Sequence, residues 1–370
     1  MTEMHYLDAN ATQPLRPAAR DAVMAAFSVV GNPSSVHQPG RHARRVMEDA
    51  REAIAAGFGG RPAGLVFTSG GTEADVMAIR AMARGRRLLI SAVEHDAVRS
   101  AATGADVVPV DRDGVVDLSA LEARLADGVA SLVCLMLANN ETGVIQPVQE
   151  AAAICRRHGA LLHVDAIQAA GRMPVHLGQL GAHSLAISSH KLGGPAGVGA
   201  LLLAPDAPFI EVLIGGGGQE RGRRGGTPSV ALIAGFAAAA AASQSDDLIR
   251  LGELRDAAER AAVACGAVVC GAPMHRLPNT TCIALPDAAA GVQVIALDLE
   301  GIAVSAGAAC SSGKVQTSHV LQAMGLGALA GQAIRVSLSW NVTPVDIDAF
   351  ATAYKRVAGR LCPTLASHAA

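Results

Sequence analysis

The amino-acid sequence predicts an α/β protein: a large domain with a seven-stranded, mostly parallel sheet sandwiched by helices, and a smaller α+β domain. Between about residues 60 and 215, short apolar runs alternate with amphipathic, alanine-rich stretches, as in βαβ units. After about residue 265 the pattern changes to short strands punctuated by proline and interleaved with helices. We therefore expect a large domain at residues 15–250, and a small domain formed by 1–14 together with 251–370.

The individual elements follow from the period of the apolar residues. The expected strands of the large sheet are 65–68, 87–91, 106–110, 131–137, 161–165, 184–188 and 198–203. The expected helices are 16–27, 37–58, 72–84, 118–124, 148–158, 230–243 and 246–265. In the small domain we expect strands at 280–285 and 333–339 and helices at 292–299 and 318–324. The residues up to Pro14 are too few to fold alone and are expected to pack against the small domain.

Composition excludes several classes of function. Hydrophobic residues make up 51% of the 370, which is enough for a large core. The formal net charge is -2 and aromatic residues are 2% of the chain, so neither a basic surface nor stacking platforms favour nucleic acid. The seven cysteines include no CxxC pair, so we expect neither a disulfide framework nor a zinc site.

The mean hydropathy of +0.33 makes a membrane segment worth testing. The longest apolar run, residues 230–242, is shorter than the roughly 18–20 residues that a bilayer requires, and reads as a buried helix. The first residues lack the basic and apolar regions of a signal peptide. We expect no membrane association and a cytoplasmic location.

Lys191 is the most informative residue of the chain. It lies between an apolar, strand-like run ending at Ser188 and a glycine-rich turn, with His190 beside it. A lysine at the end of a buried strand is typical of one that forms a Schiff base with an aldehyde cofactor.

Asp165 ends another apolar strand and would need a cationic partner if it is buried. A protonated pyridine nitrogen would serve as that partner, whereas the ordinary alternative is an aspartate that caps the next helix.

Phosphate ligands are expected where the strand at 65–68 meets the next helix. The sequence TSGGTE at 68–73 places Gly71 and Thr72 at the helix start, where unpaired N–H groups attract anions. Ser188, His190 and Thr227 would supply further donors. Taken alone, the turn at 68–73 is more typical of an ordinary capped turn. The loop at 220–228 could equally be a flexible, solvated surface segment.

Two polar residues end other strands at the same edge of the predicted sheet. Asn140, in NNETG at 139–143, could bond a cofactor hydroxyl, although an asparagine-rich turn is the simpler reading. His95 could stack on a planar ring or shuttle protons, although a lone histidine is more often structural.

Cys310 and Arg335 are the candidates of the small domain. Cys310 lies in SAGAACSSGK at 305–314, a segment of small residues with no amphipathic period, which indicates an exposed loop. A cysteine on such a loop can have a usable thiolate fraction, although an unreactive loop cysteine is a serious alternative. Arg335 stands mid-strand among apolar residues and needs either a substrate carboxylate or an internal salt bridge.

In this order, the motifs resemble the cysteine desulfurases, pyridoxal-phosphate enzymes of the class V aminotransferase group. The resemblance covers nearly the whole chain: YLDANAT at 6–12, GNPSSVH at 31–37, TSGGTE, NNETG, HVD at 163–165, HK at 190–191, RGGT at 224–227 and ACSSG at 309–313. Each piece is weak alone, whereas the ordered set is highly specific.

The resemblance implies fold type I of the pyridoxal-phosphate enzymes and a role for each matching residue. Lys191 would hold pyridoxal 5′-phosphate, Asp165 would pair with its pyridine nitrogen and His95 would stack on its ring. The phosphate would be bound by Gly71, Thr72, Ser188, His190 and, from the neighbouring subunit of a homodimer, Thr227. Asn140 and Gln168 would contact the ring oxygen, Arg335 and Asn10 the substrate, and Cys310 would be the nucleophile.

The implied activity removes sulfur from L-cysteine, giving L-alanine and a persulfide on Cys310. The ACSSG form indicates the group that matures iron–sulfur clusters (group I), so the expected partner is a scaffold protein or another sulfur acceptor. No resident metal is expected, and Cys310 would at most be a transient iron–sulfur ligand. Selenocysteine lyase, another class V aminotransferase, and a non-catalytic scaffold remain as alternatives.

Two departures from the family pattern are visible in the sequence. Gln13 replaces a usual threonine, and Lys314-Val315-Gln316 replaces the commoner Ser-Leu-Glu beside the nucleophile. The second departure bears on the choice of acceptor more than on the chemistry.

Overall fold

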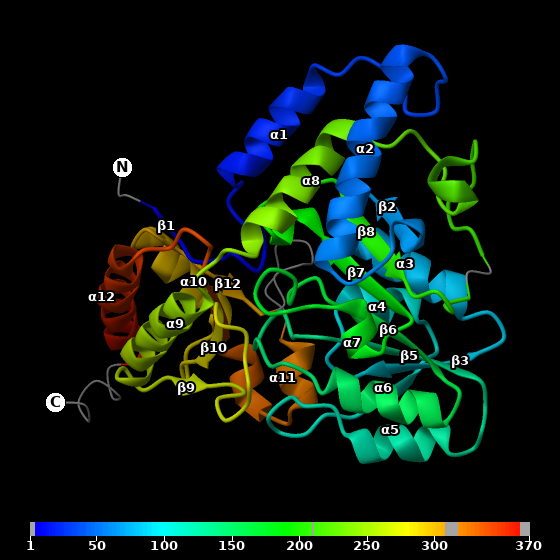
Figure 1. The fold of residues 1–370 in the computed structure, drawn as a ribbon. Helices are drawn as coiled ribbons and strands as arrows, with labels where there is room; N and C mark the ends of the chain where they lie inside the picture. Colours follow the sequence, from blue (N-terminus) through cyan, green and yellow to red (C-terminus); the bar gives the residue numbers. More distant parts are fainter. Residues whose placement is uncertain (1–3, 209–210, 308–316, 363–370) are drawn as a thin grey trace.

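A computed structural model describes residues 4–208, 211–307 and 317–362 (Figure 1). Within these ranges, two groups of elements lie side by side: a large αβα unit, and a smaller unit built from the C-terminal elements together with the first strand.

The central sheet of the large unit has seven strands, in the order β2-β8-β7-β6-β5-β3-β4. The strand β8 is antiparallel to both of its neighbours, and the remaining pairs are parallel. The strands are β2 (Leu65–Thr68), β3 (Arg87–Ser91), β4 (Asp106–Val108), β5 (Ser131–Met136), β6 (Leu161–Asp165), β7 (Ser184–Ser188) and β8 (Gly199–Leu203). The seven-stranded, mostly parallel sheet predicted from the sequence is confirmed.

Helices cover both faces of this sheet. One face packs against α3 and α4 in a core that contains Met77, Ile90 and Leu132. The other face packs against α2, α5, α6 and α8 in a core that contains Ile54, Leu135 and Phe236. The helices are α1 (Pro17–Phe27), α2 (Gln38–Gly57), α3 (Gly71–Met82), α4 (Asp96–Ala101), α5 (Leu118–Leu125), α6 (Val148–Arg157), α7 (Leu177–Leu180) and α8 (Val230–Ser243).

The smaller unit contains a four-stranded antiparallel sheet in the order β12-β13-β10-β9. Its core includes Leu7 from the N-terminal segment, because β1 pairs in parallel with β11. The strands are β1 (His5–Tyr6), β9 (Val268–Val269), β10 (Thr280–Ala284), β11 (Ile302–Ala303), β12 (Ser305–Ala306) and β13 (Ala333–Ser337). The helices are α9 (Leu248–Val263), α10 (Ala290–Leu299), α11 (His319–Ala323) and α12 (Pro344–Leu361).

The structure differs from the expected elements at identifiable places. The strand expected at 106–110 ends at Val108, because Pro109 lacks the N–H that would continue the ladder. The helix α12 was not expected, although Thr343 and Asp346 form a capping box and Pro344 occupies its first turn. The six-residue α4, which begins after the capping residue His95, was not expected either.

In the described ranges, none of the helices combines the length and the apolar character needed to cross a bilayer.

Candidate active site

Lys191 lies at the carboxyl end of β7, in the short helix η2 (Ser189–Lys191). Its Nζ atom donates hydrogen bonds to the backbone carbonyls of Asn10 and Ala11, the latter at 2.9 Å. The strand end from the large unit and the N-terminal segment from the smaller unit therefore meet at this amine.

Asp165 ends β6, the strand next to β7 in the sheet, and is 6% exposed. Burial raises the pKa of Asp165, while the positive charges of His95 and Lys191 act in the opposite direction. Its Oδ1 atom also accepts from the backbone N–H of Ile167 at 2.8 Å. The Asp165 carboxylate thus accepts a hydrogen bond within its own turn and also lies near two side chains that can carry positive charge, His95 and Lys191.

Asp75 and His163 form a buried pair close to Asp165 that sequence analysis did not single out. His163 Nε2 lies 3.1 Å from Asp75 Oδ1, and His163 Nδ1 lies 2.8 Å from Ser184 Oγ. Both members of the pair are fully buried, and burial lowers the pKa of His163 to about 3. The available signal was the spacing: His163 and Asp165 are two apart on one strand, so they share a sheet face. The pair joins α3 to β6.

Glu94 is a further buried carboxyl group near Asp165. Its Oε1 atom accepts from Ser91 Oγ at 2.5 Å and from the backbone N–H of Met136 at 2.8 Å. Burial raises the pKa of Glu94 to about 8. The Glu94 side chain therefore links the ends of β3 and β5. In the sequence, Glu94 could have been recognised as an acidic residue that stands directly before His95 at the end of a strand.

The start of α3 lies against the end of β7. Gly70, the N-cap residue, has no side chain to cap the helix, and Thr72 is exposed in the first turn. A side chain at Gly71 would meet Ile167 Cδ1 at 2.2 Å and Ser188 Cβ at 3.4 Å, so glycine permits this close approach. The Ser188 Oγ atom is buried without a hydrogen-bond partner among the described residues.

His190 and Gln168 are held by the same N-terminal segment that meets Lys191. His190 Nδ1 lies 3.2 Å from Thr12 Oγ1, and burial, followed by the charge of Lys191, lowers the pKa of His190 to about 4. The imidazole is therefore neutral at physiological pH. Gln168 Nε2 donates to the Asn10 carbonyl at 3.1 Å, which places its amide beside Lys191.

Arg335, in the middle of β13, binds two groups from other segments. Its Nη2 atom donates to Asp8 Oδ1 at 2.7 Å, and its Nη1 atom to the Asn140 carbonyl at 3.2 Å. The internal salt bridge considered from the sequence therefore exists. Arg335 Nε is buried without a partner in the described ranges, so the guanidinium retains a donor for another acceptor. Asp8 was not recognised from the sequence.

Asn10 is buried, and its side chain is occupied by protein contacts. Its Nδ2 atom donates to Thr280 Oγ1 at 2.9 Å and to the Asn140 carbonyl at 3.1 Å, while its Oδ1 atom accepts from Asn279 Nδ2 at 3.1 Å. Its backbone carbonyl, rather than its amide, faces Lys191. Asn10 therefore joins the two units at the site.

Arg172 is a buried residue of the site that sequence analysis missed. Its Nη1 atom donates to Gln168 Oε1 at 2.5 Å, and its Nη2 atom to the carbonyls of Ala9 at 3.2 Å and Lys191 at 3.4 Å. Burial lowers the pKa of Arg172. An arginine within an otherwise apolar stretch after Asp165 was the available signal.

The remaining expected site residues are Thr227 and Cys310. Thr227 is exposed, in the loop that Arg224 anchors to the start of α3 through Glu73 at 2.8 Å. Cys310 lies outside the described residues, as do Lys314, Val315 and Gln316; the chain enters that segment at Gly307.

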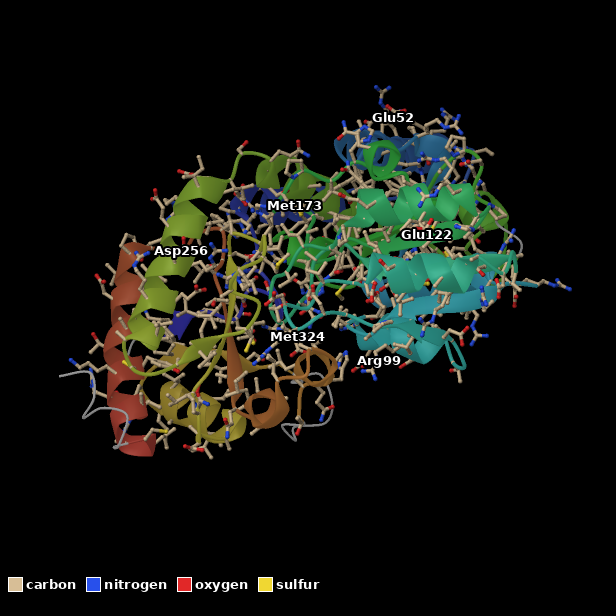
Figure 2. All side chains as sticks on the ribbon, turned by 90° about the horizontal axis from the view of Figure 1, so that it is seen from below. Glu52, Arg99, Glu122, Met173, Asp256 and Met324 are labelled. Atoms are coloured by element: carbon tan, nitrogen blue, oxygen red, sulfur yellow. The ribbon has the colours of Figure 1, made fainter. Side chains whose placement is uncertain are left out.

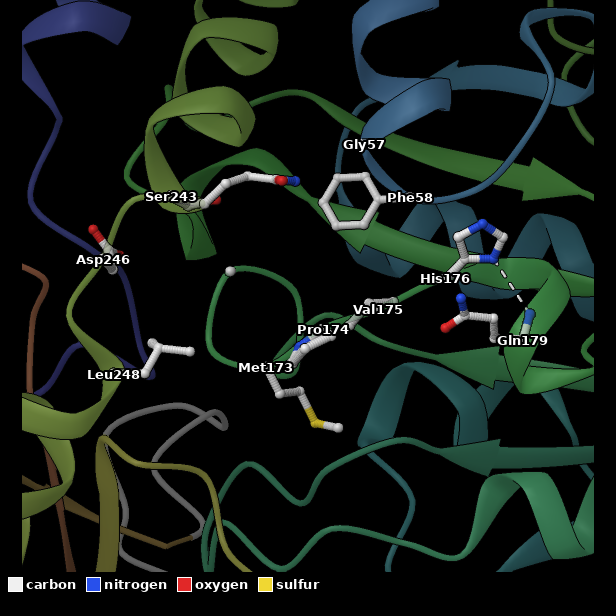
Figure 3. Close-up of a pocket in the computed structure, with 12 residues that line it drawn as sticks. Gly57, Phe58, Met173, Pro174, Val175, His176, Gln179, Ser243, Asp246 and Leu248 are labelled. Carbon is white, nitrogen blue, oxygen red and sulfur yellow. Dashed lines mark hydrogen bonds between the residues drawn. The ribbon is translucent and has the colours of Figure 1, made fainter.

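A pocket of about 360 Å³ lies beside the end of α8, next to Phe58 and the turn at 171–176 (Figure 3). It shares Gly171, Ser243 and Asp246 with a second cavity of about 10 Å³ that reaches Lys191 and Arg172. The larger pocket contains none of the expected site residues, so we place the chemistry at the strand ends and not here.

The part of the chain that the structure describes contains no cluster of three or more His, Cys, Asp or Glu side chains suited to a metal ion.

Comparison with known proteins identifies the family. The family described as aminotransferase class-V matches residues 5–350, and the chain belongs to it. A cysteine desulfurase of Cereibacter sphaeroides is 42% identical over 363 residues, covering 94% of this chain and 93% of that protein. An IscS-like cysteine desulfurase of Mycobacterium tuberculosis (strain ATCC 25618 / H37Rv) is 40% identical, with 94% of each chain covered.

The fold agrees with that of solved relatives. The X-ray structure of a NifS-like protein from Rickettsia africae ESF-5 superposes with a TM-score of 0.89 at 35% identity, covering 96% of this chain and 99% of that one. Fold type I is therefore confirmed, and the cofactor of this family is pyridoxal 5′-phosphate.

The residues present fit this cofactor. The uncapped start of α3 and the unpartnered Ser188 Oγ lie together and suit a phosphate group. At the other end, the buried Asp165 suits a protonated ring nitrogen, because a buried carboxylate requires a cation. Burial raises the pKa of Asp165, while the charges of His95 and Lys191 act in the opposite direction and so favour its ionised form.

Proposed function

We propose that this chain is a cysteine desulfurase that takes sulfur from L-cysteine, releases L-alanine and leaves a persulfide on Cys310 for iron–sulfur cluster assembly or another acceptor. The observation that carries the proposal is the meeting of Lys191, at the end of β7, with Asp165, at the end of β6, and with the Asn10 carbonyl. The identity to cysteine desulfurases over nearly the whole chain supports it.

Each end of the cofactor has its own ligands in this proposal. Lys191 would bind it covalently, Asp165 would pair with the ring nitrogen and His95 would stack on the ring. The phosphate is held by the residues Gly71, Thr72, Ser188 and His190, with Thr227 from the partner of a homodimer. Asn140 and Gln168 contact the ring oxygen, and Arg172, through Gln168 Oε1, turns the Gln168 Nε2 atom toward the Asn10 carbonyl.

When bound, the cofactor withdraws electrons from the substrate and so weakens its carbon–sulfur bond. Arg335 binds the substrate carboxylate with the donor capacity that Asp8 and Asn140 leave. The Lys191 amine, once released, moves a proton at the substrate α-carbon.

Cys310 receives the sulfur. Its thiolate attacks the substrate sulfur, so a sulfur–sulfur bond forms as the carbon–sulfur bond breaks, and the three-carbon product leaves as alanine after taking up a proton. An acceptor thiolate then attacks the outer sulfur. Because the net charge of -2 and the few aromatic residues do not favour nucleic acid, we expect the acceptor to be a protein. The location that we propose for the activity is the cytoplasm.

The proposal is tested with protein loaded with the cofactor and incubated with L-cysteine. We expect alanine in solution and the mass of one sulfur atom added to the peptide that contains Cys310. Cys310→Ser should abolish the persulfide and keep the cofactor absorbance. Alanine and sulfide release at the wild-type rate from this variant would reject the assigned role.

Selenocysteine lyase and other class V aminotransferase activities are resolved in the same assay. Rates with selenocysteine and cysteine, measured side by side, should favour cysteine. A preference for selenocysteine, or amino transfer to a keto acid without sulfur release, would assign one of these activities instead.

A further inference from the structure

Both described ends of the segment that carries Cys310 converge on the Glu141 side chain. Glu141 follows β5 and is 2% exposed. Ser318, at the first turn after the segment, donates from Oγ to Glu141 Oε2 at 2.6 Å. Gly307, just before the segment, approaches the same oxygen so closely that an added Cβ atom would lie 2.0 Å from it. One carboxyl oxygen therefore contacts both chain ends.

Each end is also tied to the site by a second contact. Gly307 follows β12, in which Ser305 pairs with Arg335 of β13. On the other side, His319 Nε2 lies 3.1 Å from the carbonyl of Glu94, directly before His95. Figure 2 labels Met324, the residue directly after α11, and Arg99, on α4.

Glu141 is connected to the site through Asn140, the residue directly before it in the chain. The carbonyl of Asn140 accepts from Arg335 and from Asn10. Burial raises the pKa of Glu141, while the Ser318 hydrogen bond and the charge of Arg335 act in the opposite direction. Burying a carboxyl group costs free energy unless hydrogen bonds or opposite charges offset the loss of hydration. Ser318 and Arg335 supply this compensation for Glu141, which indicates that its placement has a specific role.

From this geometry we infer that Glu141 is a positioning residue for sulfur transfer: it fixes both ends of the Cys310 segment relative to the substrate-binding Arg335. The inference rests on the proposed function. Glu141 does not touch the substrate, and it acts through Gly307 and Ser318. Its removal should therefore slow the arrival of sulfur on Cys310 and spare the earlier steps at the cofactor.

The test separates those two stages in a single turnover. Loaded protein is mixed rapidly with L-cysteine; the cofactor absorbance reports the first stage, and the sulfur mass on the Cys310 peptide after acid quench reports the second. For Glu141→Ala we expect the absorbance change within about twofold of wild type and sulfur transfer slowed about tenfold or more, which is about 1.4 kcal/mol. Glu141→Gln keeps an acceptor for Ser318 and should lose less than the alanine variant.

Ser318→Ala removes the same contact from the other side and keeps the test valid if Glu141→Ala does not fold. Ser318 also caps α11 by accepting from the N–H of Leu321 at 3.1 Å, so this variant is expected to lose some stability as well. The double variant Glu141→Ala/Ser318→Ala should be no slower than the slower single variant, because each single variant already removes the same hydrogen bond between Ser318 and Glu141.

Glu259→Ala is the matched control. Glu259 accepts from Thr281 Oγ1 at 2.7 Å and from Arg276 Nη1 at 2.8 Å, so it also forms a carboxyl–hydroxyl pair, and this pair involves neither Gly307 nor Ser318. It should lower stability without changing the ratio of the two rates. Unchanged sulfur transfer in both Glu141→Ala and Ser318→Ala, or an equal slowing of both stages, would overturn the inference while leaving the Cys310→Ser result, and hence the proposed function, intact.

Discussion

At the scale of single residues, buried charges without a full set of partners mark the site. Asp165, Arg335 and Arg172 are each nearly inaccessible. The two arginines are linked through Asn10: the Asn140 carbonyl accepts from both Arg335 and Asn10, and Gln168 connects Arg172 to the Asn10 carbonyl. Lys191 and Asp165 were recognisable from the sequence, because each ends an apolar strand. Arg172 and Asp8 were not, since their role depends on contacts between segments far apart in the chain.

Asp165→Asn should have opposite effects on the cofactor-free and the loaded protein. Burial raises the pKa of Asp165, so its ionised form is costly without a cationic partner, and we expect the melting temperature of the cofactor-free variant to rise. Cofactor binding should weaken by about tenfold or more, because a charge-assisted hydrogen bond contributes about 1.5–3 kcal/mol. Calorimetry and cofactor titration measure the two effects; a variant that melts lower without cofactor and binds it normally would contradict this role.

At the scale of elements, the carboxyl ends of β5, β6 and β7 and the start of α3 build the site. The seven strands of the large sheet and most of the long helices were predictable, because their apolar periods are regular, whereas the 18-residue α12 was not expected. The contacts across elements were not predictable: Asp75 and His163, which join α3 to β6, are 88 residues apart, and the spacing of His163 from Asp165 indicates only that those two share a sheet face. The short strands β1 and β11 also escaped prediction, since two residues carry no period.

Glu94, which links β3 to β5, should make stability depend on pH. Its pKa in the folded protein is about 8, above the ordinary value of 4.5, so burial favours the protonated form. This contribution is complete below about pH 4.5 and is lost as the pH rises through about 8. Relative to Glu94→Gln, the wild type should therefore lose about a few kcal/mol of unfolding free energy between about pH 5 and pH 9.

Denaturant titrations at several pH values measure this difference. Glu52→Gln, which changes an exposed side chain on α2, is the control and should leave the pH dependence of the wild type unchanged (Figure 2). Parallel curves for Glu94→Gln and wild type would show that Glu94 does not titrate in this range.

At the scale of the whole molecule, the N-terminal segment unites the two units. Leu7 lies in the core of the smaller unit, Asp8 binds Arg335, and the Asn10 carbonyl meets Lys191. The first residues were predicted to pack against the small domain, but the contacts of Asp8 with Arg335 and of the Asn10 carbonyl with Lys191 were not predicted.

The expected homodimer makes a prediction about subunit mixing. If Thr227 serves the partner's cofactor, Lys191→Ala and Thr227→Trp homodimers should both be inactive. Mixed after dissociation, they should regain about a quarter of the wild-type activity, because half of the dimers then contain one complete site. No recovery, with heterodimers demonstrated by mass, would place Thr227 in its own subunit's site or outside any site.

The account depends above all on the covalent attachment of the cofactor at Lys191. Borohydride reduction of the loaded protein, followed by peptide mass mapping, tests this directly. We expect the pyridoxyl mass on the peptide that contains Lys191, and no label in Lys191→Ala. A label on a different lysine, or a loaded protein that borohydride leaves unlabelled, would contradict it.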